Sequence, residues 1–192
     1  IDDVRFGTGT PSLVFFSDRT AFEATYPGLP LVDFEAGTVA GASVDFVPPL
    51  SAATDNSVFA PGDIIAGIAF NSRASGGAQG SDLTLYAPSS GWGTSKTLAV
   101  QVDGTDSLDI LLSEPDVQLV GMDLFTTSTE RGRVSVFGAG DVLLGHQGVD
   151  AQQGSPTFIG IYSAETITRV RYGVPAGGSG DPEAVDNVSF GN

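Results

Sequence analysis

The sequence contains no cysteine, which excludes disulfide bonds and thiolate metal sites in this chain. It also contains one lysine, Lys96, and one histidine, His146. His146 has no companion histidine for a zinc or copper site. The sequence has no Gly-x-Ser-x-Gly nucleophile elbow either, so a serine for a triad with His146 is not indicated. We therefore expect no catalytic residues.

Long apolar runs are absent as well. No window approaches 18 consecutive apolar residues, so we expect no transmembrane helix and no direct membrane insertion. No signal peptide is visible at Ile1, and we expect the chain to be a mature or trimmed form.

Positive charge is scarce. The 192 residues carry 23 acidic and eight basic side chains, for a net charge of −15. A field of this sign repels nucleic acid and anionic membrane surfaces. It suits a salty, calcium-rich exterior, where cations offset the repulsion between carboxylates. The alternative is that the acidity serves solubility alone.

The chain has instead the pattern of one β-rich domain over residues 1–192. One helix is predicted at residues 17–26, where Ser17 or Asp18 can cap the start and Pro27-Gly28 ends it. The longest apolar strand, residues 117–125, is expected to be central. Asp103-Gly104 and residues 138–141 predict hairpin turns. About a dozen strands are expected, the clearest at residues 12–16, 31–35, 64–70, 82–86, 97–102, 107–112, 117–125, 133–137, 142–144, 157–162, 167–172 and 184–190. This predicts an all-β, antiparallel two-sheet β-sandwich, of jelly-roll type in preference to an immunoglobulin-type sandwich.

The last strand carries an unusual acid. With a period of two, Asp186 shares a face with Ala184, Val188 and Phe190. A carboxylate among apolar side chains is costly unless a cation or several hydrogen bonds satisfy it. Residues 31–35 carry acids in the same way, so we expect the two strands to be neighbours. Asp33, Glu35 and Asp186 are then candidate ligands for a structural calcium ion; the alternative is that these acids are exposed or bonded to backbone amides.

Trp92 is the candidate ligand-binding residue. Small residues flank it in the Ser89-Ser90-Gly91-Trp92-Gly93 loop, which we expect to leave the ring accessible for stacking on a sugar. The alternative is that this tryptophan packs in the core or a loop.

Several short segments give a resemblance. They are Asp18-Arg19-Thr20-Ala21-Phe22, Val32-Asp33-Phe34-Glu35, residues 117–123, Phe158-Ile159-Gly160-Ile161 and residues 185–190. The chain resembles extracellular β-sandwich domains of bacterial PEP-CTERM-type sorted proteins, and more weakly MAM and carbohydrate-binding jelly rolls. The resemblance implies a secreted or cell-surface bacterial module, in which a structural calcium often ties such strands together.

We therefore expect a non-catalytic module with a structural calcium, acting in adhesion, matrix assembly or glycan binding. A polysaccharide or surface glycan is the expected partner. One alternative is a polysaccharide-active enzyme, a hydrolase or lyase, on a jelly-roll fold. Another is a self-assembling structural surface protein.

Overall fold

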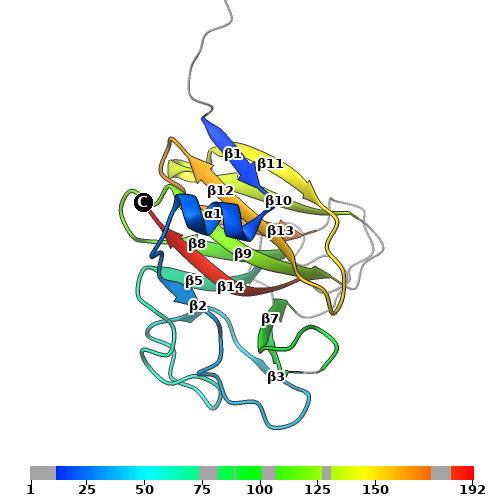
Figure 1. Cartoon of the computed structure of the whole chain (residues 1–192). Coiled ribbons are helices and arrows are strands. Elements are labelled where there is room, and N and C mark those ends of the chain that lie inside the picture. The colour runs from blue at the N-terminus through cyan, green and yellow to red at the C-terminus, as the bar shows by residue number, and fades with distance from the viewer. Residues whose placement is uncertain (1–11, 74–81, 89, 101–106, 127–130, 174–182) are drawn as a thin grey trace, which may run out of the picture.

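A computed structural model describes residues 12–73, 82–88, 90–100, 107–126, 131–173 and 183–192. Their strands form two antiparallel sheets packed face to face, which confirms the predicted all-β sandwich (Figure 1). The eight-stranded sheet has the order β1-β12-β9-β14-β7-β6-β3, and β2 also pairs with β14. The six-stranded sheet has the order β11-β10-β13-β8-β5-β4.

The bounds of these strands follow from the backbone pairing. The eight-stranded sheet consists of β1 (Leu13–Phe16), β2 (Leu31–Val32), β3 (Ser43–Phe46), β6 (Leu83–Tyr86), β7 (Thr97–Val100), β9 (Leu119–Thr126), β12 (Thr157–Ser163) and β14 (Glu183–Gly191). The six-stranded sheet consists of β4 (Leu50–Ser51), β5 (Ile68–Arg73), β8 (Ser107–Leu112), β10 (Gly132–Phe137), β11 (Leu143–Val149) and β13 (Arg169–Gly173).

The main hydrophobic core lies between the two sheets. Alternate residues of each strand supply it, because successive side chains of a strand point to opposite faces. Every residue of β9 is buried, and β9 pairs with β12 on one side and β14 on the other. The prediction that this strand is central is confirmed. Its inward side chains include Val120, Met122 and Leu124.

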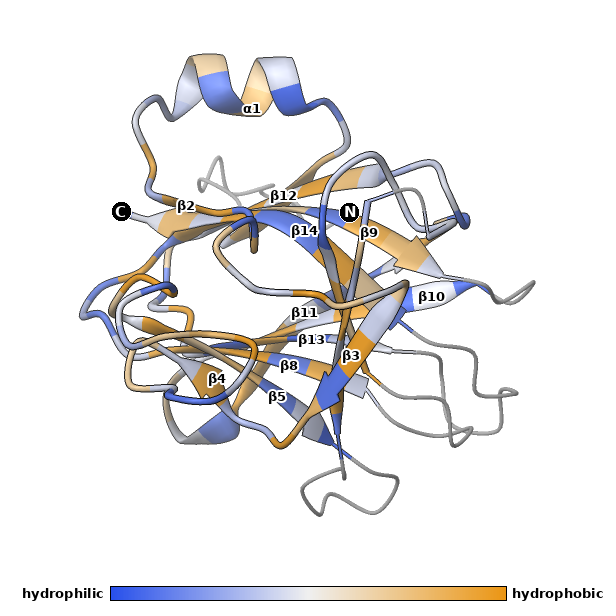
Figure 2. Ribbon diagram, turned by 90° about the horizontal axis from the view of Figure 1, so that it is seen from below, coloured by the Kyte–Doolittle hydropathy of each residue, from blue (hydrophilic) through white to orange (hydrophobic). Residues whose placement is uncertain are grey.

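The predicted helix is confirmed as α1 (Arg19–Thr25), which lies on the outer face of the eight-stranded sheet (Figure 2). The Asp18 side chain accepts a hydrogen bond from the Ala21 amide at 3.1 Å and so caps the first turn. Phe22 is fully buried and packs on Gly160 and Gly121, whose missing side chains leave room for its ring. None of the described helices is long and apolar enough to cross a membrane.

One predicted hairpin is confirmed and one is wrong. Strands β10 and β11 pair as a hairpin, with the short 3-10 helix η1 (Ala139–Asp141) at the turn. Strands β7 and β8 do not pair, because β7 belongs to the eight-stranded sheet and β8 to the six-stranded sheet. Asp103-Gly104 itself lies outside the described residues.

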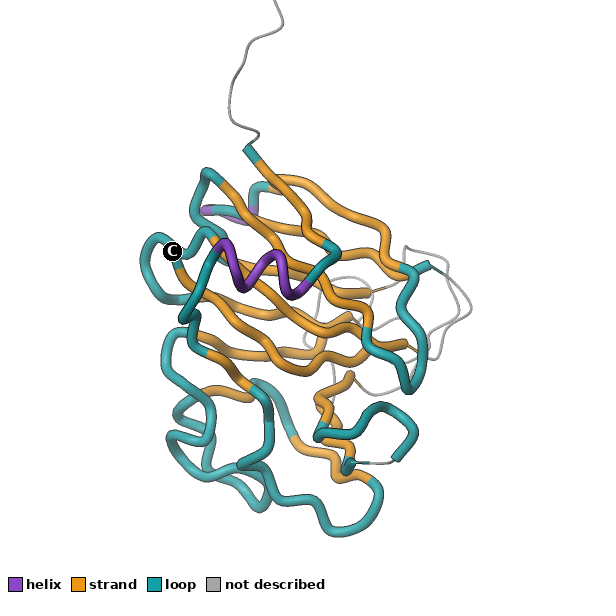
Figure 3. The backbone as a smooth tube through the Cα atoms, viewed as in Figure 1, coloured by secondary structure: helices purple, strands orange, loops and turns teal. Residues whose placement is uncertain are grey.

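The strand predicted at residues 64–70 begins later than expected, at Ile68. The segment between β2 and β5 is mainly loop with two short strands, and it gathers at one end of the molecule (Figure 3). Its apolar residues are nevertheless buried, with Ile64 and Phe59 each 1% exposed. An apolar pattern in a buried loop therefore resembles the pattern of a strand in the sequence.

Candidate functional site

A β-bulge in β14 decides where its acid lies. The register against β9 shifts between Asp186 and Ser189, and Asn187 there has a left-handed backbone with φ of 50°. Val185 and Val188 both face the main core, so the alternation is broken between them. The prediction that Asp186 shares a face with Val188 and Phe190 is wrong: Asp186 lies opposite Asp123 of β9, on the outer face of the sheet.

The surroundings of Asp186 are polar but almost closed to solvent. The residue is 1% exposed, and its carboxylate accepts hydrogen bonds from the Ser95 hydroxyl and, at 2.7 Å, from the Asn187 amide. Burial raises the pKa of Asp186 to about 6, the two hydrogen bonds lower it, and the charges of Asp123 and Glu35 raise it further. This carboxylate therefore titrates within reach of neutral pH.

Asp123 is the partner acid across the strands. Its carboxylate forms an ion pair with Arg19 of α1 at 2.8 Å and accepts a hydrogen bond from the Asn187 side chain at 3.0 Å. The helix therefore supplies a cation beside a pair of acids that face each other in adjacent strands.

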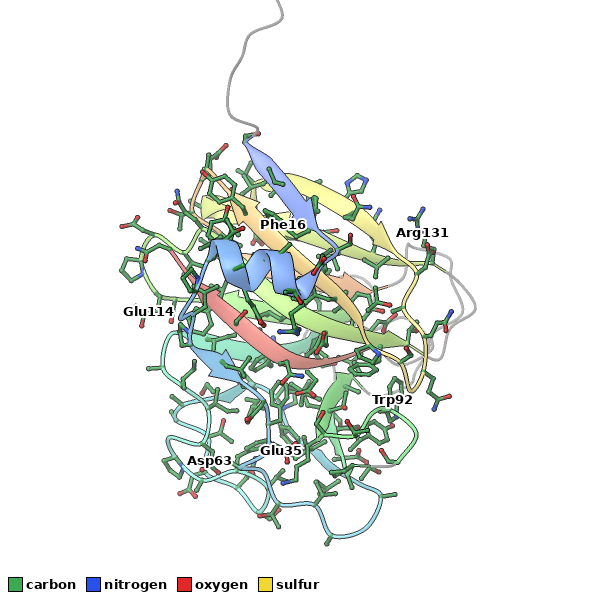
Figure 4. The ribbon with its side chains drawn as sticks, viewed as in Figure 1. Phe16, Glu35, Asp63, Trp92, Glu114 and Arg131 are labelled. Atoms are coloured by element: carbon green, nitrogen blue, oxygen red, sulfur yellow. The ribbon has the colours of Figure 1, made fainter. Side chains whose placement is uncertain are left out.

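The predicted neighbour of β14 is confirmed, since β2 pairs with it through Val32 and Val188. However, the prediction that Asp33 and Glu35 share one face of this strand is wrong, because β2 ends at Val32 and both acids lie in the turn that follows it. The Asp33 carboxylate accepts from the Glu35 amide at 3.1 Å, and Glu35 pairs with Lys96 at 3.6 Å. Figure 4 shows Glu35 in the loop region below β2.

The three acids predicted to bind calcium are thus placed unequally. Glu35 lies close enough to Asp186 to raise its pKa, whereas the recorded contact of Asp33 is with its own turn. Among the described residues, no group of three His, Cys, Asp or Glu side chains is arranged to hold a metal ion. The calcium site at Asp33, Glu35 and Asp186 stays a prediction.

The expectation that the Trp92 ring is accessible is wrong. Trp92 is 4% exposed and packs in a small cluster with Ala99, Phe125 and Ala184 on the outer face of the eight-stranded sheet. Its ring centroid is 5.2 Å from that of Tyr86. Small neighbours in the loop let the ring fold down onto the sheet, so the accessibility that made it a stacking platform is missing.

The outer face of the six-stranded sheet carries a line of polar side chains that crosses five strands. Each member lies directly opposite the next in the strand register. The helix α1 covers the other sheet (Figure 2), whereas on this side the short 3-10 helix η1 brings Asp141 to Arg169. We call this line the polar row; in order from β5 to β11 it consists of Asn71, Asp109, Arg171, Ser135 and His146.

The polar row is held together at its centre and is open to solvent at its His146 end. Arg171 donates two hydrogen bonds to Asp109, at 2.7 and 3.0 Å. Asp109 is 2% exposed, while His146 at the far end is exposed. The Asn71 Oδ1 atom is buried and accepts no hydrogen bond. A ligand on this face would meet a rigid centre beside the exposed His146, and a turn of the Asn71 side chain would add its unpaired oxygen.

The sequence contains a partial signal for this face. Asp109 and Arg171 each stand between two inward apolar residues of their strands, and Asn71 stands between inward Phe70 and Ser72. Period-two alternation gives one face of each strand. It does not give the order of the strands, which is what aligns the five side chains.

The fold and this face define a class: an antiparallel two-sheet β-sandwich with one sheet covered by a helix and a polar outer face on the other. No protein-family profile matches the chain, and no curated protein matches it.

Some solved structures are similar at low identity. One is a family 29 carbohydrate-binding module from Piromyces equi, 8% identical, with a TM-score of 0.40 over 95% of this chain and 93% of the module. Another is a family 11 carbohydrate-binding module of a cellulosomal cellulase of Clostridium thermocellum, 11% identical, with a TM-score of 0.33 over 85% of this chain and 94% of the module. We base the function on the side chains of this protein.

Proposed function

We propose that this protein is a non-catalytic carbohydrate-binding module, secreted or displayed at a cell surface, and that it binds glycan on the outer face of its six-stranded sheet. The observation that carries this proposal is the polar row, a line of hydrogen-bonding side chains across five strands. A soluble domain does not need such a line for its own folding, because simple polar residues suffice on a solvated sheet face.

The chemistry of the polar row suits a polyhydroxyl ligand. Sugar hydroxyls both donate and accept, so a glycan surface needs both kinds of partner. Arg171 supplies donors, and Asn71 carries an Oδ1 atom that is buried and accepts no hydrogen bond within the protein, so a rotation of its side chain would offer that acceptor to a ligand. Phe137, partly exposed and directly opposite Arg169, adds an apolar ring on the same face, with the Arg169 guanidinium lying over one side of the ring.

The rigidity of the face favours binding. Its side chains stand on strands, and the central pair of Asp109 and Arg171 is fixed by two hydrogen bonds. A ligand that binds a preformed surface loses less free energy in ordering the protein. A role in adhesion or matrix assembly, and the predicted calcium, belong to the same proposal.

A binding assay with paired variants tests this proposal. The wild-type protein is titrated with a panel of soluble polysaccharides by affinity electrophoresis and calorimetry. Asn71→Ala and His146→Ala each remove one end of the polar row. We expect each to weaken binding of whichever polysaccharide the wild type binds by about three- to tenfold, the value of one hydrogen bond.

The control is Glu23→Gln on α1, which lies over the other sheet and changes an exposed ion pair. Unchanged affinity in Asn71→Ala and His146→Ala, with wild-type melting temperatures, would move the binding surface away from this face. Binding to no member of the panel would reject the function itself.

A further inference from the structure

Basic residues concentrate on the outer face of the six-stranded sheet. In a chain with eight basic and 23 acidic residues, four arginines stand on the outward positions of β5, β10 and β13. Among the residues that the structure describes, two acids contact this set. The arginines are Arg73, Arg133, Arg169 and Arg171, and the acids are Asp109 and Asp141.

One buried carboxylate holds three of these arginines. Arg171 binds Asp109 through two nitrogens at 2.7 and 3.0 Å. Arg169 lies 3.4 Å from the same carboxylate, and Arg73 lies 3.5 Å from it. Three guanidinium groups around one carboxylate leave positive charge that the carboxylate does not neutralise.

A second contact fixes the most buried arginine. Arg169 donates to Asp141 at 3.0 and 3.2 Å, and its guanidinium lies 3.8 Å from the centre of the Phe137 ring. This leaves Arg169 as a support for the face. Arg73 and Arg171 have side chains 32% and 26% exposed, and Arg133 is exposed.

The exposed arginines keep donors for a ligand. A guanidinium has five N–H groups, and Arg171 uses two of them on Asp109. The remaining N–H groups are held in a fixed orientation by that bond. Fixed guanidinium donors match the planar, two-oxygen geometry of an anionic group such as a carboxylate.

The charge of the rest of the chain sharpens the contrast. The protein carries a net charge of −15, yet this face has more arginines than acids among its described side chains. Partly buried positive charge that is not neutralised is unfavourable, and a bound anion would relieve it. The remaining surface, rich in acids, repels the same anion and so confines it to this face.

We propose that the outer face of the six-stranded sheet selects acidic polysaccharides, whose anionic groups bind Arg73, Arg133 and Arg171. This inference rests on the proposed function and adds the ligand class to it. Asn71, once its side chain turns the buried Oδ1 atom outward, then accepts from a hydroxyl of the same sugar chain, beside the anionic group held by the arginines. Asp109 and Asp141 position the arginines and do not touch the ligand.

The experiment compares polymers that differ only in charge. Polygalacturonate is titrated beside its methyl-esterified form, and dextran sulfate beside dextran, with the full chain. We expect the acidic member of at least one pair to bind about tenfold or more tightly than its neutral counterpart. The first pair reports carboxylate recognition, and the second reports sulfate recognition.

Variants locate the effect. Arg133→Gln and Arg73→Gln should each weaken binding of the acidic polymer about tenfold and leave the neutral polymer unchanged. Arg171→Lys keeps the charge but loses the two parallel hydrogen bonds to Asp109. It should also weaken binding of the acidic polymer. Lys96→Gln removes one positive charge at the other sheet and should leave the affinity for both polymers unchanged. Melting temperatures confirm that the variants fold.

The outcomes separate the two proposals. Equal binding of acidic and neutral polymers, lost in Asn71→Ala, overturns the acidic selectivity and keeps the glycan-binding function. Binding of neither member of either pair, together with binding of a neutral glycan elsewhere in the panel, also overturns the selectivity alone. Acid-selective binding that Arg133→Gln, Arg73→Gln and Arg171→Lys all leave intact overturns the assignment to this face.

Two further readouts accompany the titration. An increase in the ultraviolet absorbance of an unsaturated uronate would show that the protein recognises the acidic polymer and cleaves it as a lyase. The recognition would support the inference, and the cleavage would reject the non-catalytic part of the proposed function. Light scattering at low salt tests whether the arginine face binds the acidic surface of a second copy. Association that Arg133→Gln abolishes, without polymer binding, would overturn the inference.

Discussion

At the scale of single residues, a buried side chain in this protein does not always have apolar neighbours. Asp186 is as buried as the core residues of its strand, yet its neighbours are Ser95, Asn187 and Asp123. Trp92 is also buried, although its sequence neighbours are small and polar. Both residues were singled out from the sequence for their chemistry, and in both cases the backbone path decided their environment.

The raised pKa of Asp186 gives a pH-dependent stability. Its pKa is about 6 in the folded protein against an ordinary 3.8, so the folded state holds more protons than the unfolded state between these values. Stability from this group is therefore present at low pH and falls as the pH rises from about 4 to about 6. The two values set a ceiling of about 3 kcal/mol.

We expect the free energy of unfolding of Asp186→Asn to exceed that of the wild type by about 1–2 kcal/mol at pH 7.5 in EDTA, and to equal it near pH 4. Denaturant unfolding at both pH values measures the difference. The Ser95 hydroxyl can accept from the new amide, so that contact survives, whereas the long hydrogen bond of 3.3 Å that the Asn187 side chain donates to the same oxygen is lost. Asp123→Asn is the control, because it weakens the ion pair with Arg19 and should destabilise at pH 7.5. A variant less stable than wild type at pH 7.5 in EDTA would contradict the assignment.

At the scale of elements, the close packing of α1 depends on glycines beneath it. An added Cβ at Gly160 would lie 2.5 Å from Cδ2 of Phe22, and at Gly121 one would lie 2.9 Å from Cε1 of the same ring. Phe22 also packs its ring 5.7 Å from that of Phe158. The helix therefore sits where strand side chains are missing.

Gly160→Ala should destabilise the protein by about 1–3 kcal/mol, the usual penalty for overpacking, because the Phe22 ring must move. Gly93→Ala is the matched control: its added Cβ would lie 3.5 Å from the Phe125 ring, an ordinary contact. Urea denaturation of both variants measures the difference. Equal stabilities would show that α1 is loosely held.

The strands themselves were predictable, but only some of their partners were: the β10–β11 hairpin and the β2–β14 neighbours were predicted correctly, and the β7–β8 hairpin was wrong. Period-two patterns located β6, β8, β9, β10 and β13 to within a few residues, because burial on one face constrains each strand independently. Pairing was inferred from Asp103-Gly104, a turn signal that also fits a connection between sheets. The bulge at Asn187 depends on the neighbours of β14, and the polar row depends on strand order, so neither is written in a local pattern.

At the scale of the whole molecule, charge is unevenly distributed. Acids outnumber bases almost three to one, while arginines gather on the outer face of the six-stranded sheet. On the opposite side of the sandwich, acids meet where β14 has β7 beside one half and β2 beside the other. Glu35 and Asp186 approach each other there, from the segments that follow β2 and lie within β14.

Calcium would act at that meeting point. An ion that binds the folded chain and not the unfolded chain stabilises it by mass action, by about 2.7 kcal/mol at a hundredfold excess over its dissociation constant. It would also replace the proton that the raised pKa of Asp186 otherwise favours, since a metal ligand must be deprotonated. The stabilisation should therefore disappear as the pH falls below about 6.

We expect the melting temperature to rise by several degrees from EDTA to millimolar calcium at pH 7.5, and not with magnesium, which demands a tighter octahedral shell. Asp186→Ala should abolish the rise, Glu35→Gln should reduce it, and Asp33→Ala tests whether that carboxylate leaves its turn to join the ion. Metal analysis of the EDTA-treated protein guards against retained calcium. If the wild type then melts at one temperature in both solutions, the acids around Asp186 act through hydrogen bonds and protons alone, and the stability of Asp186→Asn in EDTA measures that contribution directly.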